Sequence, residues 1–245
     1  MEKQTAIIIP ARYGSSRLEG KPLLKVCGKP IIQWVWEKAC NVPMVDRVII
    51  ATDDDRIFDA CKAFGAEVEM TSTNHKSGSD RIAEVAKRHS EIAYIINLQG
   101  DEPLIEQENI ELVIKGIKFD DKADISTLVR EITDENELNN PNLVKCIFDV
   151  NNYAMYFSRA KIPYERNIGK SKFYGHLGIY GYKKDALFKM TNLAQTTYEM
   201  SESLEQLRAL QNGMKIKVSI VKNVPVGIDT QEDFEKFKAM VENKV

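Results

Sequence analysis

Short apolar runs alternate with helix-like segments along roughly the first half of the chain. The pattern predicts strands at Thr5–Ile9, Arg47–Ala51, Glu67–Met70, Ile92–Leu98 and Ile125–Val129, of which Thr5–Ile9 and Ile92–Leu98 are expected to be buried. The segments between them predict helices at Pro30–Cys40, 52–65 (closed by Gly65), Ser79–His89 and Gln107–Ile117. Strands that alternate with helices in this way form right-handed βαβ units, so we expect an α/β fold with a mostly parallel sheet.

The pattern changes at about residue 143. LVKCIFDVNNYAMYFSR predicts a hairpin that turns at Asn151–Asn152, and HLGIYGY predicts another short strand. Thr196 and Glu199 have capping-box spacing before a long predicted helix, MSESLEQLRALQ, which Gly213 ends. A strand at Lys215–Val221 and a helix at Thr230–Val241 complete the pattern. We expect a single domain of residues 1–245, with an α/β core at 1–142 and 181–245 and a β-rich insertion at 143–180.

Composition and charge exclude several classes of protein. The chain has 245 residues, 43% of them hydrophobic and 29% charged, and a net charge of −2, which disfavours a nucleic-acid binder. No apolar run is long enough to cross a membrane, and the one in MEKQTAIIIP is too short for a signal-peptide core, so we expect a cytoplasmic protein. The cysteines form no CxxC pair, which favours packing roles for all of them: Cys27, Cys40, Cys61 and Cys146.

The first strand runs into a loop rich in glycine, serine and positive charge. IIIPARYGSSRLEGKP carries Arg12, Arg17 and Lys21, separated by small residues. Ligands of open α/β sheets bind outside the carboxyl ends of the strands, where such a loop can cradle phosphate groups. The spacing matches neither a Walker A loop nor a GxGxxG dinucleotide motif. A solvated loop with scattered cations is the alternative interpretation.

Two acidic positions add to this signal. Asp101 follows the strand IAYIINL in QGDEP, and Asp229 precedes the last helix in VGIDTQED. Taken alone, Asp101 could form a turn and Asp229 could cap the helix. Mg²⁺ is usually held by one or two carboxylates together with substrate phosphates. The cationic loop and the two aspartates therefore predict chemistry on a nucleoside triphosphate.

Eight motifs in fixed order resemble one known family. They are IIPARYGSSRLEGKPL, ATDDDRI, HKSGSDRIAE, NLQGDEPLI, YFSRAKIPY, HLGIYGY, LEQLRAL and GIDTQEDFE. They resemble the cytidylyltransferases that activate 3-deoxy-manno-octulosonate (Kdo), the CMP-Kdo synthetases of bacterial lipopolysaccharide and capsule synthesis. The resemblance implies a single domain of nucleotide-diphospho-sugar-transferase type, with a Rossmann-like sheet flanked by helices, and a homodimer. It also implies the reaction CTP + Kdo → CMP-Kdo + diphosphate with Mg²⁺. Because residues 143–180 depart from the βαβ pattern, they are the candidate dimerisation region.

By motif position, the resemblance assigns three groups of site residues. Those for the nucleotide are Arg12, Arg17, Lys21, Ser79, Arg81 and Gln99. Those for the sugar acid are Gln99, Arg159, His176, Tyr180, Glu205 and Gln206. Asp101 and Asp229 hold the metal ion, and together with Arg12 and Lys21 they form the catalytic set.

These roles suit the implied chemistry. The anomeric hydroxyl attacks the α-phosphorus and diphosphate leaves, so cations are needed where negative charge accumulates. The guanidinium of Arg159 can hold both oxygens of the sugar carboxylate. Taken alone, His176 would more often be a structural hydrogen-bonding group than a ligand contact. Glu199, Glu202 and Gln206 share one predicted helix face, which either lines the sugar pocket or is solvated.

Departures from the family pattern leave alternatives open. Glu19 replaces a usual proline, TTYEMSESLEQLR replaces a usual proline–leucine–glutamate opening, and Cys146 replaces a usual valine. The first two departures leave 8-amino-Kdo or another 3-deoxy-2-keto acid open as the acceptor. Activation of a nine-carbon acid such as sialic acid is a separate alternative. A glycosyltransferase that uses Asp53–Asp55 as a metal motif is an alternative of another class, although the helix-like RIFDACKAF that follows favours a role for these residues at the start of a helix. A nucleotide-binding module without catalysis is a further one.

Overall fold

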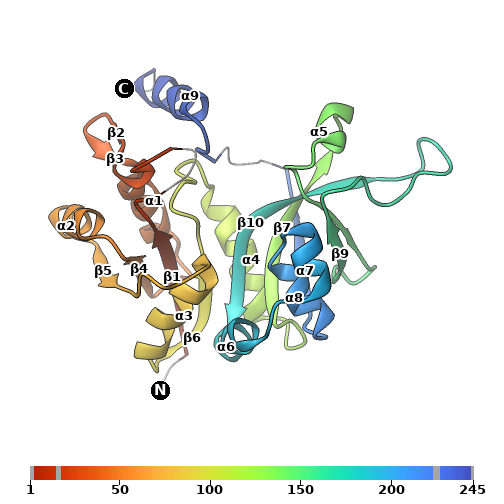
Figure 1. Ribbon diagram of the computed structural model, residues 1–245, viewed down its shortest axis with the longest axis horizontal. Coiled ribbons are helices and arrows are strands. Elements are labelled where there is room, and N and C mark those ends of the chain that lie inside the picture. The colour runs from red at the N-terminus through yellow and green to blue at the C-terminus, as the bar shows by residue number, and fades with distance from the viewer. Residues whose placement is uncertain (1–2, 15–17, 223–226, 244–245) are drawn as a thin grey trace. The chain divides into compact units, whose positions relative to one another are not determined.

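A computed structural model describes residues 3–14, 18–222 and 227–243 of the chain (Figure 1). The chain forms two compact units. Unit 1 consists of Met1–Glu111 and Pro225–Val245, and unit 2 consists of Leu112–Val224. Helix α4 (Gln107–Lys118) contains the boundary between them.

Unit 1 contains a parallel sheet in the order β6-β1-β4-β5. Its strands are β1 (Gln4–Ala11), β4 (Arg47–Thr52), β5 (Glu67–Met70) and β6 (Ile92–Asn97). Consecutive residues of β1 are fully buried, as expected for a parallel strand covered on both faces. The predicted α/β fold with a mostly parallel sheet is confirmed in this unit.

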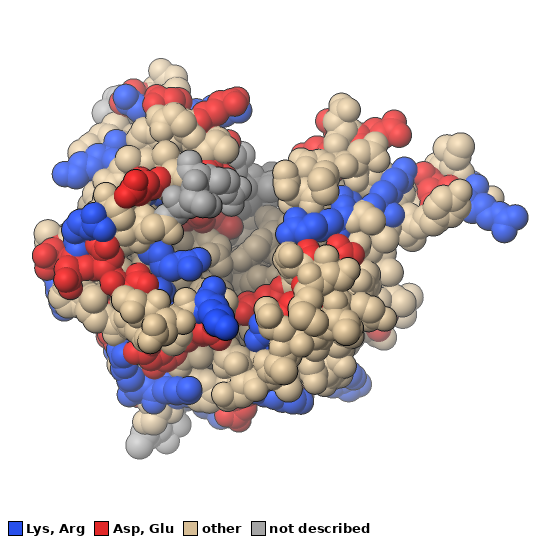
Figure 2. All heavy atoms as spheres, viewed as in Figure 1, with Lys and Arg blue, Asp and Glu red and all other residues tan. Residues whose placement is uncertain are grey.

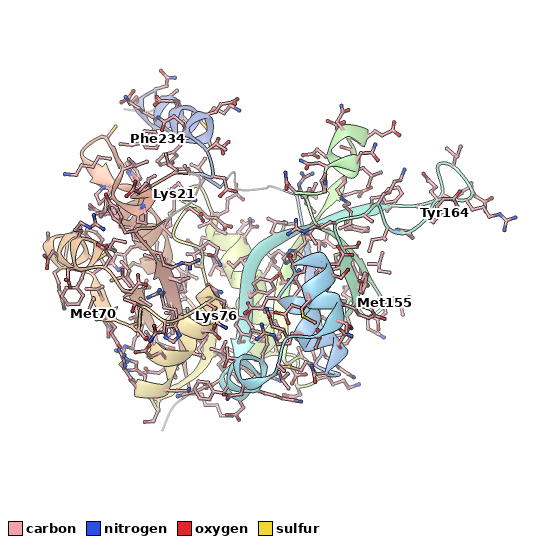
Figure 3. The ribbon with its side chains drawn as sticks, viewed as in Figure 1. Lys21, Met70, Lys76, Met155, Tyr164 and Phe234 are labelled. Atoms are coloured by element: carbon pink, nitrogen blue, oxygen red, sulfur yellow. The ribbon has the colours of Figure 1, made fainter. Side chains whose placement is uncertain are left out.

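Helices and short elements complete unit 1. The helices are α1 (Ile31–Cys40), α2 (Asp55–Ala63), α3 (Gly78–Arg88) and α9 (Gln231–Glu242). A 3₁₀ turn η1 (Lys21–Leu23) and the hairpin β2 (Lys25–Val26) and β3 (Lys29–Pro30) follow the first loop. Phe234 and Phe237 of α9 pack on Ile31 and Ile228, which anchors the C-terminal helix beside the first loop (Figure 3). The C-terminal segment thus belongs to the same core as the N-terminal loop.

Unit 2 is built mainly from antiparallel pairs. Its strands are β7 (Ile125–Ile132), β8 (Lys145–Phe148), β9 (Ala154–Ser158), β10 (Phe173–Lys183) and β11 (Ile216–Val221). Strand β10 pairs antiparallel with β7 and β8, β8 pairs antiparallel with β9, and β11 pairs parallel with β7. Asn152 has a φ of 60° in the β8–β9 turn, and the predicted hairpin is confirmed. Between β9 and β10 a long loop carrying Tyr164 projects from the rest of unit 2 (Figure 3).

Unit 2 differs from the prediction at its helices. They are α5 (Glu135–Asn139), α6 (Lys184–Asn192), α7 (Thr197–Glu202) and α8 (Gln206–Gln211). The predicted capping box of Thr196 and Glu199 is present, but the single long helix was wrong. Ser203 adopts a left-handed conformation (φ 52°) that ends α7, and the side chain of Arg208 in α8 reaches back to bond Glu199. The short predicted strand HLGIYGY is part of the 11-residue β10.

Charged side chains of both signs lie on the surface of the protein (Figure 2). On the face shown in Figure 2, acidic and basic side chains of the described residues are interspersed, in keeping with the small net charge. Within residues 3–14, 18–222 and 227–243, no helix is both long and apolar enough to span a bilayer. The division into an α/β core and a β-rich insertion at 143–180 stays a prediction.

Candidate functional site

A polar cavity lies at the carboxyl ends of β1 and β6 in unit 1. It has a volume of about 460 Å³. It is lined by Pro10, Ala11, Arg12, Gly14, Lys21, Pro22, Gln99, Gly100, Asp101 and Asp229. We call it the unit 1 pocket. Its position agrees with the rule that ligands of open α/β sheets bind at this end of the strands.

Lys21 is the central cation of the unit 1 pocket (Figure 3). Its ammonium lies 2.6 Å from Asp101 Oδ2 and 3.4 Å from Asp229 Oδ1, and it donates to the carbonyl of Ile228 at 2.7 Å. The lysine is 8% exposed. Gly20 precedes it with a φ of 65°, and a Cβ at Gly20 would come within 3.1 Å of the Tyr13 ring, so the turn that delivers Lys21 requires glycine.

The two aspartates are joined by the backbone as well as by Lys21. The N–H of Ile228 donates to the carbonyl of Asp101 at 2.8 Å. The N-cap of α9 is Thr230, in a capping box with Asp233, so the alternative that Asp229 caps this helix was wrong. The carboxylate of Asp229 is half-exposed and lines the unit 1 pocket. Asp101 and Asp229 are therefore both within reach of one cation.

Glu102 is a third carboxyl group of this region, and no role was predicted for it from the sequence. Burial raises its pKa to about 8, and the neighbouring charges of Asp101 and Asp229 act in the same direction. The acidic pair in QGDEP was the available signal. Two carboxylates on one ammonium, with a third carboxyl group nearby, form an oxygen-rich set of the kind that hard divalent cations prefer. The residues present therefore fit a divalent metal ion.

Of the other residues of unit 1 that were predicted to bind the nucleotide, some line the unit 1 pocket and others do not. Arg12 and Gln99 line the unit 1 pocket, and Arg17 lies outside the described residues. Ser79 and Arg81 are buried in α3 and are not among the residues that line the pocket. The guanidinium of Arg81 donates to Asp53 at 2.6 Å and to the Thr71 hydroxyl.

The DDD segment is used for local structure. Asp53 pairs with Arg81. Asp54 is the N-cap of α2 and accepts from the N–H of Arg56. The hydrogen bond from the Arg56 guanidinium holds the pKa of Asp54 below its usual value, and the bond from the Arg56 N–H acts in the same direction. These contacts favour the helix-start interpretation over the glycosyltransferase metal motif.

The predicted sugar residues belong to unit 2, where Arg159 is held by backbone carbonyls. Its Nε donates to the carbonyl of Glu202 at 2.7 Å, Nη1 to that of Pro141 at 3.1 Å and Nη2 to that of Ser203 at 3.4 Å. The carboxylate of Glu202 accepts from the Arg159 N–H at 2.9 Å and from the Ser158 hydroxyl at 2.6 Å. Both the backbone and the side chain of Arg159 are therefore fixed.

His176 and Tyr180 form a tilted pair of rings on β10. Their ring centroids lie 5.3 Å apart, and Phe157 packs on His176 at 5.1 Å. The Thr127 hydroxyl donates to the carbonyl of Ile179 at 2.8 Å, so it accepts from His176 Nε2 at 3.0 Å, which places the imidazole proton on Nε2. Burial lowers the pKa of His176 to about 3 and raises that of Tyr180 well above its usual value. His176 is therefore a neutral group at physiological pH.

Of the two alternatives for the face of Glu199, Glu202 and Gln206, the solvated one is wrong for Glu199 and Gln206, which are buried. Glu199 is 4% exposed and forms a buried ion pair with Arg208, whose Nε lies 2.8 Å from a Glu199 oxygen. Gln206 is 7% exposed, and Glu205 lies within 4.0 Å of Arg208. This ion pair joins α7 to α8 across the break at Ser203.

Comparison with known proteins places the chain among cytidyl-transferring enzymes. The profile of a family described as cytidylyltransferase matches residues 6–216. The 3-deoxy-manno-octulosonate cytidylyltransferase of Fusobacterium nucleatum is 47% identical over 229 residues, which cover 94% of this chain and 93% of that protein. The enzyme of the same name from Thermodesulfovibrio yellowstonii is 47% identical over 244 residues, with 94% and 95% covered.

Solved structures agree with the sequence relatives. A CMP:2-keto-3-deoxy-manno-octonic acid synthetase complexed with CTP superimposes with a TM-score of 0.95 at 41% identity, covering 99% of this chain and 100% of that one. A 4-diphosphocytidyl-2C-methyl-D-erythritol synthase from Anaerococcus prevotii, with a TM-score of 0.64 over 98% and 96% of the chains, is 16% identical and shows the fold alone. The chain therefore belongs to the cytidylyltransferase family, and within it to the 3-deoxy-manno-octulosonate cytidylyltransferases.

Proposed function

We propose that this protein transfers the cytidylyl group of CTP to the anomeric hydroxyl of Kdo, giving CMP-Kdo and diphosphate. The observation that carries the proposal is the contact of the Lys21 ammonium with both Asp101 and Asp229, in a cavity that Arg12 also lines. This set combines the cation that a triphosphate needs with the carboxylates that a metal ion needs. The sequence relatives support the same reaction.

The basic residues of the first loop bind the triphosphate in this proposal. Arg12, Arg17 and Lys21 neutralise the charge that accumulates on the departing diphosphate. Lys21 can exchange its aspartate contacts for phosphate oxygens, because all of them are charge-assisted bonds from the same ammonium. Ser79 and Arg81 bind the cytidine part, and Arg81 acts from its buried pair with Asp53.

Cytidylyltransferases of this family typically use a divalent metal ion. We propose that the ion is Mg²⁺ and that Asp101 and Asp229 hold it. When bound, Mg²⁺ supplies Lewis acidity, which favours ionisation of the attacking hydroxyl and offsets phosphate charge. Gln99 lines the same cavity and orients the acceptor hydroxyl.

The sugar acid is bound by residues of unit 2. Arg159 uses one N–H of each of its three nitrogens on backbone carbonyls, and each terminal nitrogen carries a second N–H. Those two N–H groups suit the two oxygens of a carboxylate. His176, Tyr180, Glu205 and Gln206 bind the hydroxyl groups, with His176 acting as a neutral hydrogen-bonding group.

We also propose that the protein is a homodimer. Tyr164 is 89% exposed and Ile168 is 90% exposed, and both lie on the projecting loop of the 143–180 region. Large apolar side chains at such exposure mark interaction surfaces. The variant Tyr164→Ser/Ile168→Ser is expected to shift the molar mass measured by light scattering from dimer to monomer, and an unchanged mass contradicts this interface. A cytoplasmic location stays a prediction.

A substrate panel tests the proposed function. Diphosphate release is measured with CTP, UTP or ATP against Kdo, 8-amino-Kdo and sialic acid, each with Mg²⁺. We expect the highest kcat/KM for CTP with Kdo. A higher kcat/KM with 8-amino-Kdo or sialic acid would assign the alternative acceptor, and no diphosphate release with any pair would contradict a cytidylyltransferase.

A further inference from the structure

Lys145 is a fully buried cation in unit 2. It is the first residue of β8 and is 0% exposed. Its ammonium donates to the carbonyls of Asn140 at 2.9 Å, Leu143 at 2.9 Å and Arg159 at 2.7 Å. An ammonium has three N–H groups, so these three carbonyls account for all of them.

The environment of Lys145 is costly for a charge. Burial lowers its pKa, and the positive charge of Arg159 acts in the same direction, while the carboxylate of Glu202 opposes both. The hydrogen-bond partners of the ammonium are neutral carbonyls. A methionine of similar length would avoid the desolvation of a charge, so the lysine needs another explanation.

The three carbonyls that accept from Lys145 lie at two places that affect the position of the Arg159 side chain. The first is Arg159 itself, whose backbone carbonyl accepts from Lys145. The second is the turn at residues 140–143, in which the carbonyls of Asn140 and Leu143 accept from Lys145. Between them, the carbonyl of Pro141 accepts from Arg159 Nη1 at 3.1 Å. Lys145 thus ties the arginine backbone to the turn that its guanidinium contacts.

The strand register explains how Lys145 reaches Arg159. Lys145 pairs with Ser158 in the antiparallel β8–β9 ladder, and Arg159 is the next residue along the chain. Opposite residues of an antiparallel pair lie close together, so a lysine at this register can reach the carbonyl that follows its partner. Arg159 is also bonded to Glu202. The carboxylate of Glu202 accepts from the backbone N–H of Arg159, and the backbone carbonyl of Glu202 accepts from Arg159 Nε.

We propose that Lys145 is a positioning residue for substrate binding, which fixes the outer N–H groups of Arg159 in the orientation that receives the carboxylate of the sugar acid. This inference rests on the proposed function, because it requires that Arg159 bind that carboxylate. Lys145 should therefore affect the binding of the sugar acid and not the binding of CTP.

Steady-state kinetics of Lys145→Met and Lys145→Gln test the assignment. Loss of bonds from a charged donor corresponds to roughly 10- to 100-fold in affinity, so we expect Lys145→Met to raise the KM for Kdo at least about tenfold. The KM for CTP should change less than about twofold. Lys145→Gln keeps an amide donor and should show a smaller increase. Lys183→Met is the control, because Lys183 donates instead to the carbonyls of Asp120 and Asp121.

A double-mutant cycle with Arg159→Gln separates positioning from general loss of structure. If Lys145 acts through Arg159, Lys145→Met should raise the KM for Kdo less than about twofold in the Arg159→Gln background. The same fold increase in both backgrounds would overturn the inference. So would an unchanged KM for Kdo in both Lys145 variants while Arg159→Gln raises it, and in that case the proposed function stands. An unchanged KM for Kdo in Arg159→Gln itself would instead contradict the proposed role of Arg159 and, with it, this inference.

Discussion

Two lysines, one in each unit, are both buried, but their ammonium groups bond different kinds of acceptor. Lys21 of unit 1 contacts two carboxylates and one carbonyl, whereas Lys145 of unit 2 donates to three carbonyls. A carboxylate can exchange one cation for another, so the partners of Lys21 can pass to a metal ion while its ammonium moves to phosphate oxygens. Backbone carbonyls are part of the fold and cannot be exchanged in this way.

The difference teaches how the two kinds of substrate group would be bound in the proposed reaction. In unit 1 the charges of Lys21, Asp101 and Asp229 neutralise one another, and in the proposed reaction a charged ligand would replace these contacts. In unit 2 the guanidinium of Arg159 donates to backbone carbonyls of the protein, and only the N–H groups that these bonds do not use can bind a substrate.

The largest expected effect is the loss of activity when the unit 1 carboxylates are neutralised. Asp101→Asn and Asp229→Asn each remove a negative charge that contacts Lys21 and is assigned to the metal ion. We expect each to lower kcat/KM for diphosphate release by about 10³-fold or more, since charge stabilisation is usually the largest contribution to such catalysis. Asp55→Asn, at an exposed position in the first turn of α2, is the control and should retain activity. Full turnover in both variants would contradict the metal assignment.

Replacement of Lys21 should reduce activity and make the protein responsive to divalent ions. Lys21→Met leaves Asp101 and Asp229 without their shared ammonium, and we expect a loss of about 10²-fold in kcat/KM. Without CTP, added Mg²⁺ should raise the melting temperature of Lys21→Met more than that of the unaltered protein, because the ion replaces the missing positive charge. Lys145→Met should show no such gain. An equal Mg²⁺ response in all three proteins would remove the contrast between the two lysines.

In unit 2, the buried ion pair of Glu199 and Arg208 should matter for stability. Glu199→Ala removes the carboxylate that bonds the buried guanidinium of Arg208 directly, and we expect the free energy of unfolding to fall by about 3 kcal/mol. The exposed pair of Glu232 and Lys236 in α9 is the matched control, where Glu232→Ala should cost about 0.5 kcal/mol or less. Chemical denaturation measures both. Equal losses would mean that burial of the first pair is energetically unimportant.

The smallest predicted effect is the pH dependence contributed by His176. Its pKa is lowered from 6.5 to about 3, so between these values the unfolded state binds more protons than the native state. The stability is therefore fully present above pH 6.5 and is lost as the pH falls toward 3. Between pH 7 and pH 4.5, His176→Gln should lose about 2 kcal/mol less unfolding free energy than the unaltered protein. The same loss in both would show that the imidazole is protonated as easily in the fold as in water.

The sequence predicted most accurately those features that depend on local pattern. The strand at Glu67–Met70 and the capping box of Thr196 and Glu199 follow from side-chain alternation and from spacing within one turn. The meeting of Lys21, Asp101 and Asp229 was predicted because the carboxyl ends of parallel strands share one edge. The helix α5 was missed although Asp134 provides an N-cap signal.

The remaining features depend on contacts that residue types do not encode. The break at Ser203 is stabilised where Arg208 reaches Glu199, and helix periodicity continues through that position. The network of Lys145 and Arg159 uses backbone carbonyls, which every residue has, so no motif identifies it. The raised pKa of Glu102 likewise results from burial that its charged sequence context does not predict.

The central claim is that the protein joins a cytidylyl group to a sugar acid, and ³¹P NMR of the reaction tests it most directly. With CTP, Kdo and Mg²⁺, the three phosphorus signals of CTP should be replaced by one phosphodiester signal of CMP-Kdo and one diphosphate signal. These products should form in equal amounts, because attack at the α-phosphorus releases diphosphate intact. Orthophosphate with CDP, or CTP signals that persist with active sugar acid present, would contradict the account.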